Sequence, residues 1–311
     1  MVVILDKAKE GIINPDGFDN VTKFQMVPLR GTREVFAQTS SSPALFTFSR
    51  QNIALIANFR ELPSKTPMAG SEPDRFMNTF TVPANKKFQF TVKGFGEGFT
   101  FLNGHDTDST GITFEADLAI SVKPALPRKF CFVFVSDLVR ATVRAKINPR
   151  DLLAPVKAVF KDQANVDLVE IDEKDTIRAI DVHADLEDPI NLDTDAKDKV
   201  DARLKELFPK LFEEGETDFI VYVVWRLRGK HKQGKILGKA FQPGAGGPNT
   251  VYIGLEPTDA SQRVHMMAHE FGHAMGLPHA LKETSLMFPT AAVQSNVLVP
   301  GHIEQLHMSS L

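Results

Sequence analysis

The sequence has too little cysteine and too small a charge excess for several large classes of protein. Its 311 residues include a single cysteine, Cys131. An intrachain disulfide needs two cysteines, so a small disulfide-stapled scaffold is excluded. The net charge is −3 and the pI about 6.3, which provides no basic surface for a polyanion. We therefore expect no nucleic-acid partner.

Long apolar runs are also missing. The longest apolar stretch covers residues 219–225, whereas a membrane-spanning helix needs about 20 residues. The apolar start at residues 1–5 is shorter than the ~7–15 residues of a signal-peptide core. We expect no membrane association and no Sec signal in this sequence. Export by a signal-less route, or after removal of a signal, is favoured over a cytoplasmic location.

Phenylalanine is concentrated in the first part of the chain, where 14 of the 24 phenylalanines precede residue 123. Short runs there alternate between apolar and polar residues and are separated by Gly-, Pro-, Asn- and Ser-rich turns. This pattern predicts an antiparallel, Ig-like β-sandwich over residues 1–124. Its role is open: it would bind a target, aid delivery or shield an active site. The runs are Leu45–Phe48, Ile53–Phe59, Phe76–Val82, Lys87–Val92, Phe99–Leu102 and Ile112–Val122.

Pro124 and Pro127 break the strand pattern, and we place a domain boundary between residues 124 and 128. Beyond it, helical and strand periods alternate, which predicts an α+β domain over residues 128–311. One predicted helix begins after Asn148, and another is interrupted by Pro209. A further helix is expected from about residue 259 to residue 275.

That last helix contains the most informative residues of the chain. His269 and His273 are four residues apart, so both imidazoles lie on one helical face, one turn apart. Two imidazoles in this arrangement can bind the same metal ion. Glu270 follows the first histidine without occupying a ligand position, so it can accept a proton from a metal-activated water. We therefore predict metal-dependent hydrolysis with Glu270 as the general base.

The residues after the helix supply a third ligand. Gly276 can adopt the left-handed conformation that ends a helix, and Pro278 prevents its continuation. The chain then reverses, so His279 can return to the metal. Three protein ligands leave a fourth position for water, which is typical of a catalytic zinc site. Imidazole also binds copper, nickel and iron, but this spacing indicates one catalytic zinc ion.

The pattern HExxHxxGxxH in residues 269–279 resembles the zinc signature of the metzincin metalloproteases, and the sequence is most similar to the matrixin branch. The resemblance implies a zinc endopeptidase with a polypeptide substrate. It also implies that Met287 lies in a tight turn beneath the metal, and that residues 300–308 form a closing helix. By the same resemblance, an edge strand binds substrate as an added β-strand, and its residues are Leu237, Gly238, Lys239, Ala240 and Phe241.

The sequence also departs from that family. The residue after the third histidine is Ala280, which does not identify a metzincin subfamily, and Pro289 stands where some metzincins carry a tyrosine. No Pro-Arg-Cys motif is present, so latency by a cysteine switch is not expected. Residues 196–213 resemble an insertion. A structural calcium ion is compatible with the resemblance but has no support, because the acidic residues 181–198 lack the glycine and final glutamate of a calcium loop.

Other readings remain open beside the general protease. The chain could be a dedicated effector or toxin protease whose N-terminal domain recognises a single protein target. It could also be a zinc-binding module that does not cleave, although the glutamate then has no purpose. His265 lies one turn before His269. We expect it to be structural, because a fourth protein ligand would close the metal site.

Overall fold

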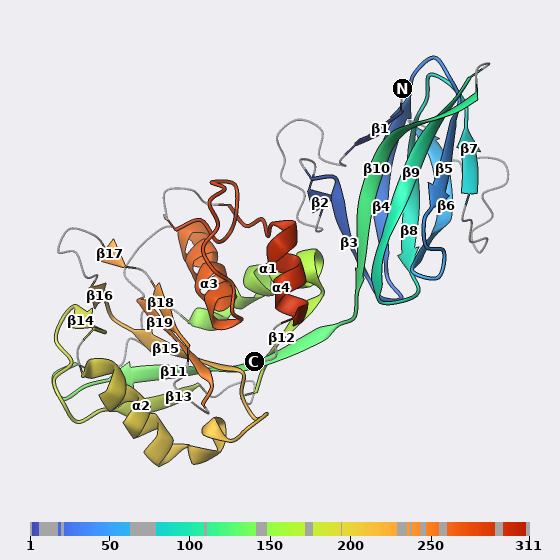
Figure 1. Ribbon diagram of the computed structural model, residues 1–311. Coiled ribbons are helices and arrows are strands. Elements are labelled where there is room, and N and C mark those ends of the chain that lie inside the picture. Colours follow the sequence, from blue (N-terminus) through green and yellow to red (C-terminus); the bar gives the residue numbers. More distant parts are fainter. Residues whose placement is uncertain are drawn as a thin grey trace. The chain divides into compact units, whose positions relative to one another are not determined.

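A computed structural model describes residues 2–5, 18–19, 22–62, 79–108, 111–140, 148–171, 177–193, 195–228, 235–236, 238–242, 247–254, 260–289 and 295–308. The chain divides into two compact units (Figure 1). The first contains residues 1–126, 162–165 and 297–304, and the second contains residues 127–161, 166–296 and 305–311. Residues 162–165 and 297–304 thus group with the first unit, although the sequence analysis assigns them to the second domain.

The first unit is built from two β-sheets around one core. The alternating sequence runs explain this arrangement, because each strand points every second side chain inward. In β5, for example, Ala44, Phe46 and Phe48 are buried and the residues between them are not. Phe46 packs face to face with Phe80, at 4.9 Å between ring centroids, and edge-on against Phe88. Whether the unit is Ig-like in type stays a prediction.

The strand order in the two sheets is β1-β4-β8-β6 and β2-β3-β10-β9-β5-β7. Neighbouring strands are antiparallel except β10 and β3, which are parallel. The strands are β1 Val2–Leu5, β2 Phe18–Asp19, β3 Phe24–Pro28, β4 Thr32–Thr39, β5 Ala44–Phe48, β6 Ala54–Leu62, β7 Thr79–Val82, β8 Lys87–Gly94, β9 Gly98–Asp108 and β10 Gly111–Lys123.

The second unit contains a mixed sheet with the order β12-β11-β15-β19-β18, in which β13 also pairs with β11. Its central strand β15 is buried on both faces, which is why its sequence is apolar throughout. All six residues of β15 are buried. The strand β18 lies at one end of the order and runs antiparallel to β19. The strands are β11 Leu126–Ser136, β12 Val166–Glu170, β13 Arg178–Asp181, β15 Phe219–Val224, β18 Gly238–Phe241 and β19 Asn249–Gly254.

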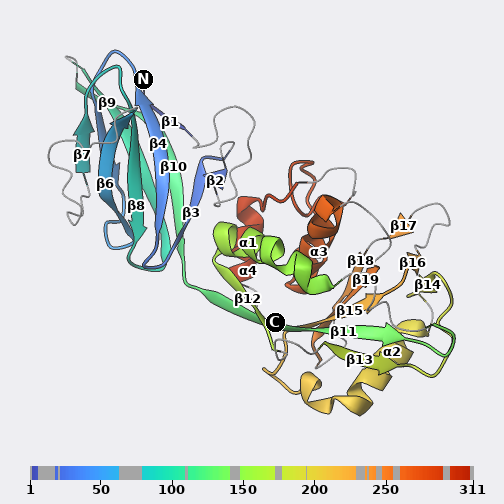
Figure 2. The ribbon, with the colours of Figure 1, turned by 180° about the vertical axis from the view of Figure 1, so that it is seen from behind.

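Helices lie on both faces of this sheet, with α1 and α3 on one side and α2 on the other (Figures 1 and 2). A small second sheet joins β14 Ile190–Asn191, β16 Leu227–Arg228 and β17 Lys235–Ile236. None of the described helices is long and apolar enough to cross a bilayer. The helices are η2 Pro149–Leu152, α1 Leu153–Ala164, α2 Ala196–Leu207, η3 Pro209–Phe212, α3 Ala260–Ala274 and α4 Pro300–Met308.

Several local predictions are confirmed. The Asn148 side chain accepts a hydrogen bond from the Arg150 N–H at 3.0 Å and so caps η2. The helix interrupted by Pro209 ends as α2 at Leu207, and η3 begins at the proline. The sequence of residues 236–241 predicts a single strand, but Ile236 belongs to β17 and Gly238–Phe241 forms β18, and these two strands lie in different sheets. Leu237, between them, lies outside the described residues.

Candidate metal centre

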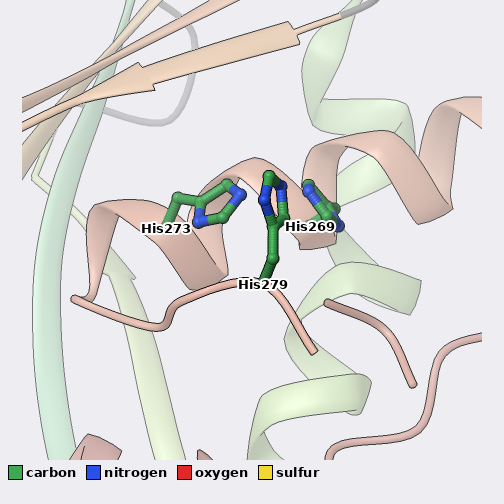
Figure 3. A group of neighbouring side chains, drawn as sticks. All are labelled: His269, His273 and His279. Carbon is green, nitrogen blue, oxygen red and sulfur yellow. The ribbon is translucent and has the colours of Figure 1, made fainter. Parts of the chain in front are cut away.

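The C-terminal half of α3 places His269 and His273 next to each other. Their ring centroids are 4.7 Å apart, as expected for neighbours at i and i+4. The ring of His279 lies 4.6 Å from that of His273 and 5.4 Å from that of His269. Figure 3 shows the three rings together, with His279 extending from the segment after the helix. One potential ligand atom from each residue lies within 4.8 Å of the other two.

The reversal that returns His279 is made by the end of α3. Gly276 has a φ of 89°, the left-handed conformation in which glycine has no steric penalty. Its N–H donates to the His273 carbonyl at 2.9 Å, and the Leu277 N–H donates to the Gly272 carbonyl at 2.9 Å. These two bonds form a Schellman motif. The glycine therefore turns the chain while satisfying carbonyls at the end of the helix.

Backbone carbonyls orient two of the three imidazoles. Nδ1 of His269 lies 2.8 Å from the Leu286 oxygen, and Nδ1 of His273 lies 2.7 Å from the Leu277 oxygen. A carbonyl oxygen only accepts hydrogen bonds, so the proton of each neutral ring is on Nδ1 and the lone pair is on Nε2. Burial lowers the pKa of His273, and it lowers the pKa of His269 to about 4. Both rings are therefore neutral at neutral pH, as a metal ligand must be.

This donor set fits a zinc ion. In a tetrahedral site with Zn–N bonds of about 2.0–2.1 Å, ligand nitrogens are roughly 3.3 Å apart. The three histidine atoms are within 4.8 Å of one another, so small side-chain rotations bring them to that spacing. Hydrogen bonds hold Nδ1 of His269 and of His273, which leaves Nε2 of each for the metal. His279 is exposed, so the open side of the site faces solvent.

Glu270 is buried beside the histidines, with 7% of its surface exposed. Burial raises the pKa of its carboxyl group to about 8, although a hydrogen bond from the Ala240 N–H opposes this effect. Its Oε2 atom is buried and has no hydrogen-bond partner among the described residues. An unpartnered buried carboxyl oxygen is costly in a purely structural side chain. Glu270 is therefore a candidate functional residue of the site.

The strand β18 approaches Glu270 closely because it carries a glycine at the point of contact. A Cβ atom on Gly238 would lie 2.4 Å from Cγ of Glu270 and 2.9 Å from its Cδ and Oε1. Ala240, two residues along the same strand, provides the N–H for the carboxyl group. Small residues at these two positions thus leave room for the glutamate between α3 and the edge of the sheet.

Met287 lies directly beneath α3 and is fully buried. Its sulfur occupies the space that a side chain on Gly272 would need, because a Cβ there would be 2.5 Å from Sδ. The turn that carries it is closed by the Ser285 hydroxyl, which accepts from the Met287 N–H at 3.2 Å. The Met287 carbonyl accepts from the Ala280 N–H at 2.8 Å. The turn is thereby attached to the segment that carries His279.

A cleft of about 530 Å³ runs along the site. It is lined by β18 with Gln242 and by the segment from Gly276 to His279. Glu270, His273 and Gln305 also line it. A cleft lined by the last strand of a sheet, as β18 is among the described strands, can accept an extended peptide as an additional strand.

The sequence analysis also singled out His265 and an edge strand. His265 is buried on α3 with its ring 6.1 Å from that of His269, and the three-histidine group does not include it. Of the predicted edge-strand residues, Gly238, Lys239, Ala240 and Phe241 line the cleft.

Sequence reasoning missed the contacts that hold the site together from a distance. Asn249 at the start of β19 donates to the Ala274 carbonyl at 2.6 Å and so anchors the end of α3. Gln305 on α4 donates to the Gly276 carbonyl at 2.8 Å. Neither residue belongs to a recognisable motif, and no periodicity points to them. The carbonyl oxygens of Leu277 and Leu286 also contact the histidines. Every residue has a main-chain carbonyl, so the sequence does not reveal this role.

Comparison with known proteins gives consistent matches to one family. A sequence profile described as matrixin matches residues 145–302. Human matrix metalloproteinase-26 is 37% identical over 62 residues, and probable matrix metalloproteinase 095L of Invertebrate iridescent virus 3 is 37% identical over 65 residues. Each stretch is 18% of this chain, but it spans only 24% of the human protein and 18% of the viral one.

Similarity to solved structures is weak. Domains 4 and 5 of the S-layer protein SbsC match 32% of this chain and 41% of that chain at 12% identity, with a TM-score of 0.21. The PapD-like domain of human CEP192 matches 39% of this chain and 94% of that chain at 10% identity, with a TM-score of 0.20. Scores of this size carry no argument about fold or function.

Proposed function

We propose that this chain, which belongs to the matrixin family of metalloproteases, acts as a zinc-dependent endopeptidase. The observation that supports this most directly is the group of three histidines beside a buried carboxyl group. His269, His273 and His279 offer three ligand atoms on one side of the site. Glu270 borders the same cleft. Three protein ligands and an open side are the arrangement of a catalytic zinc site.

When bound, a zinc ion supplies a water of lowered pKa and a positive charge for the scissile carbonyl. Glu270 accepts the proton of the attacking water and delivers it to the leaving amine. Without a metal, burial holds the pKa of this carboxyl at about 8, so at pH 7 the group is mostly protonated. A nearby positive charge favours the ionised form, which is the form that acts as a base.

The peptide substrate would bind along β18. Among the described strands, β18 is last in the order of its sheet, and its residues line the cleft. An extended peptide can pair with such an edge through main-chain hydrogen bonds, whatever its side chains are. Gly238 and Ala240 are small, so β18 lies close to Glu270. A peptide held on this strand would therefore have a backbone carbonyl close to the general base.

The test is a comparison of the wild type with Glu270→Ala. We expect the wild type to cleave casein and to stop when a chelator removes its metal. The variant should still bind one zinc ion, because the carboxyl group is not a ligand, but its activity should fall by about 10²–10⁴-fold. If it cleaved casein like the wild type, or if the purified wild type bound no stoichiometric zinc, the proposal would be wrong.

A second candidate is a dedicated protease whose first unit recognises one protein target. It is favoured by the apolar side chains exposed on β9 and β10 of that unit. Phe99 and Phe101 are each 38% exposed, and Phe114 is 56% exposed. Exposed apolar groups of this kind often mark a site of protein interaction. Proteomic profiling of cleavage products in a lysate would separate the two candidates, because a dedicated protease yields one target and a general one yields many.

A further inference from the structure

Gln305 lies on α4, outside the metal-binding motif, but its side chain reaches the motif. Its Nε2 atom donates a hydrogen bond of 2.8 Å to the Gly276 carbonyl, across 29 residues of sequence. Gly276 is the left-handed residue that ends α3 and begins the return towards His279. Both residues belong to the second unit, and both line the cleft.

The hydrogen bond acts on the metal site through the segment it holds. Leu277 follows Gly276, and its carbonyl oxygen accepts from Nδ1 of His273 at 2.7 Å. His279 lies two residues beyond Leu277, on an exposed stretch that begins at Pro278. The position of the Gly276 peptide group therefore influences the orientation of His273 and the return of His279.

We propose that Gln305 is a positioning residue of the metal site, whose side-chain amide holds Gly276 so that His273 and His279 converge on the ion. The inference rests on the proposed function only in taking the ion to be zinc. Groups that orient metal ligands from outside the coordination sphere typically change metal affinity by about 10–100-fold. Gln305 acts through a carbonyl one residue from the Leu277 acceptor, so we expect the lower end of that range.

The experiment compares zinc affinity in three variants at position 305, measured by competition with a chromogenic chelator. Gln305→Met keeps the length of the side chain but removes the donor. Gln305→Glu keeps the shape but can only accept, so it opposes the Gly276 carbonyl. Both should bind zinc about tenfold more weakly than the wild type. Gln305→Lys restores a donor and should recover most of the affinity.

Two further measurements separate positioning from general damage. Met308→Gln, on a 75% exposed side chain of the same helix, is the matched control and should bind zinc like the wild type. The visible absorption of the Co²⁺-loaded protein reports ligand geometry directly. It should change in Gln305→Met and Gln305→Glu but not in Gln305→Lys or the control. Melting of the metal-free proteins should show all four variants folded at the assay temperature.

The proposal would be overturned if Gln305→Met and Gln305→Glu kept wild-type zinc affinity and an unchanged Co²⁺ spectrum. It would also be overturned if Gln305→Lys bound zinc as weakly as Gln305→Met, because the donor would then not matter. None of these readouts uses a peptide. If the wild type bound zinc but cleaved nothing, the proposed endopeptidase activity would be refuted. The role of Gln305 would still be decided by the zinc affinities of the variants.

Discussion

Gly238 lies so close to Glu270 that a substitution at this glycine would directly perturb the proposed general base. In Gly238→Ala, the new Cβ would be placed 2.4 Å from Cγ of Glu270 and 2.9 Å from its Cδ and Oε1. Carbon atoms in contact are normally about 3.5–4.0 Å apart, so at least one group must move by roughly 1 Å. The atom met first is Cγ, near the backbone of a buried side chain, and β18 is paired with β19 at Ile253. Moving either the Glu270 side chain or β18 therefore costs free energy.

We expect the substitution to lower the rate while the protein stays folded. A misplacement of about 1 Å of a catalytic group can lower a rate by about 10²-fold. Overpacking of this kind typically costs about 1–3 kcal/mol of folding free energy, which leaves most proteins folded at 25 °C. Gly238 holds no ligand atom of the metal group, so zinc stoichiometry should stay at one per chain. We therefore expect Gly238→Ala to lower kcat/KM by about 100-fold with its zinc retained.

The assay is the initial rate on a fluorogenic peptide beside the zinc content of the same preparation. Gly247→Ala is the matched control, because a Cβ there would lie 3.9 Å from the Phe212 ring, an ordinary contact. It should cleave like the wild type. If Gly238→Ala retained more than half of the wild-type rate, the assignment of Glu270 as the general base at this position would be refuted. Loss of zinc in that variant would contradict the reasoning too.

Two further predictions concern the metal-free protein. The folded pKa of Glu270, about 8, is above its usual value of 4.5, so its contribution to stability is fully present below pH 4.5 and is lost as pH rises to about 8. Glu270→Gln removes this loss, so its free energy of unfolding relative to the wild type should rise across that range, by about 3 kcal/mol at pH 7. The difference in melting temperature between the two proteins should rise with it, and a difference independent of pH would contradict the raised pKa. Gly272→Ala should lower the melting temperature by a few degrees, since its Cβ would lie 2.5 Å from the Met287 sulfur. In a Met287→Ala background the same substitution should cost much less, and equal costs in both backgrounds would show that the two residues do not meet.

The two parts of the chain differed in how fully the sequence could describe them. The alternating runs of the first part led to the strands, because a strand with one buried face repeats every two residues. In the second part, β15 is buried on both faces and reads as a simple apolar run. The pairing of strands was not readable in either part. For example, β10 runs parallel to β3, although nearly 100 residues separate them in the sequence.

The strands β17 and β18 show how a local sequence pattern can mislead. Residues 236–241 read as one strand, but Lys235–Ile236 pairs with β16 and Gly238–Phe241 pairs with β19. Strand propensity reports that a segment suits an extended conformation. It does not report which neighbour the segment will pair with, because that depends on strands distant in sequence. Within the described residues, the strand proposed to bind substrate is β18, Gly238–Phe241.

The sequence by itself determined the parts of the site that depend on local geometry. The spacing of His269 and His273 places them on one helical face because an α-helix has 3.6 residues per turn. Gly276 could be identified as the end of that helix because only glycine adopts the left-handed conformation without penalty. These features lie within eleven residues, so each follows from short-range sterics and hydrogen bonding.

Only the tertiary structure decided the pKa and the orientation of those residues. The pKa of Glu270 depends on its burial against β18, and the clearance at Gly238 comes from a strand 32 positions earlier in the chain. The carbonyl of Leu286 orients His269, and the amide of Gln305 holds Gly276. Desolvation and hydrogen bonds between distant segments arise only after the sheet, α3 and α4 have packed. A linear sequence carries no local signal of such contacts, because the groups that form them have no fixed spacing.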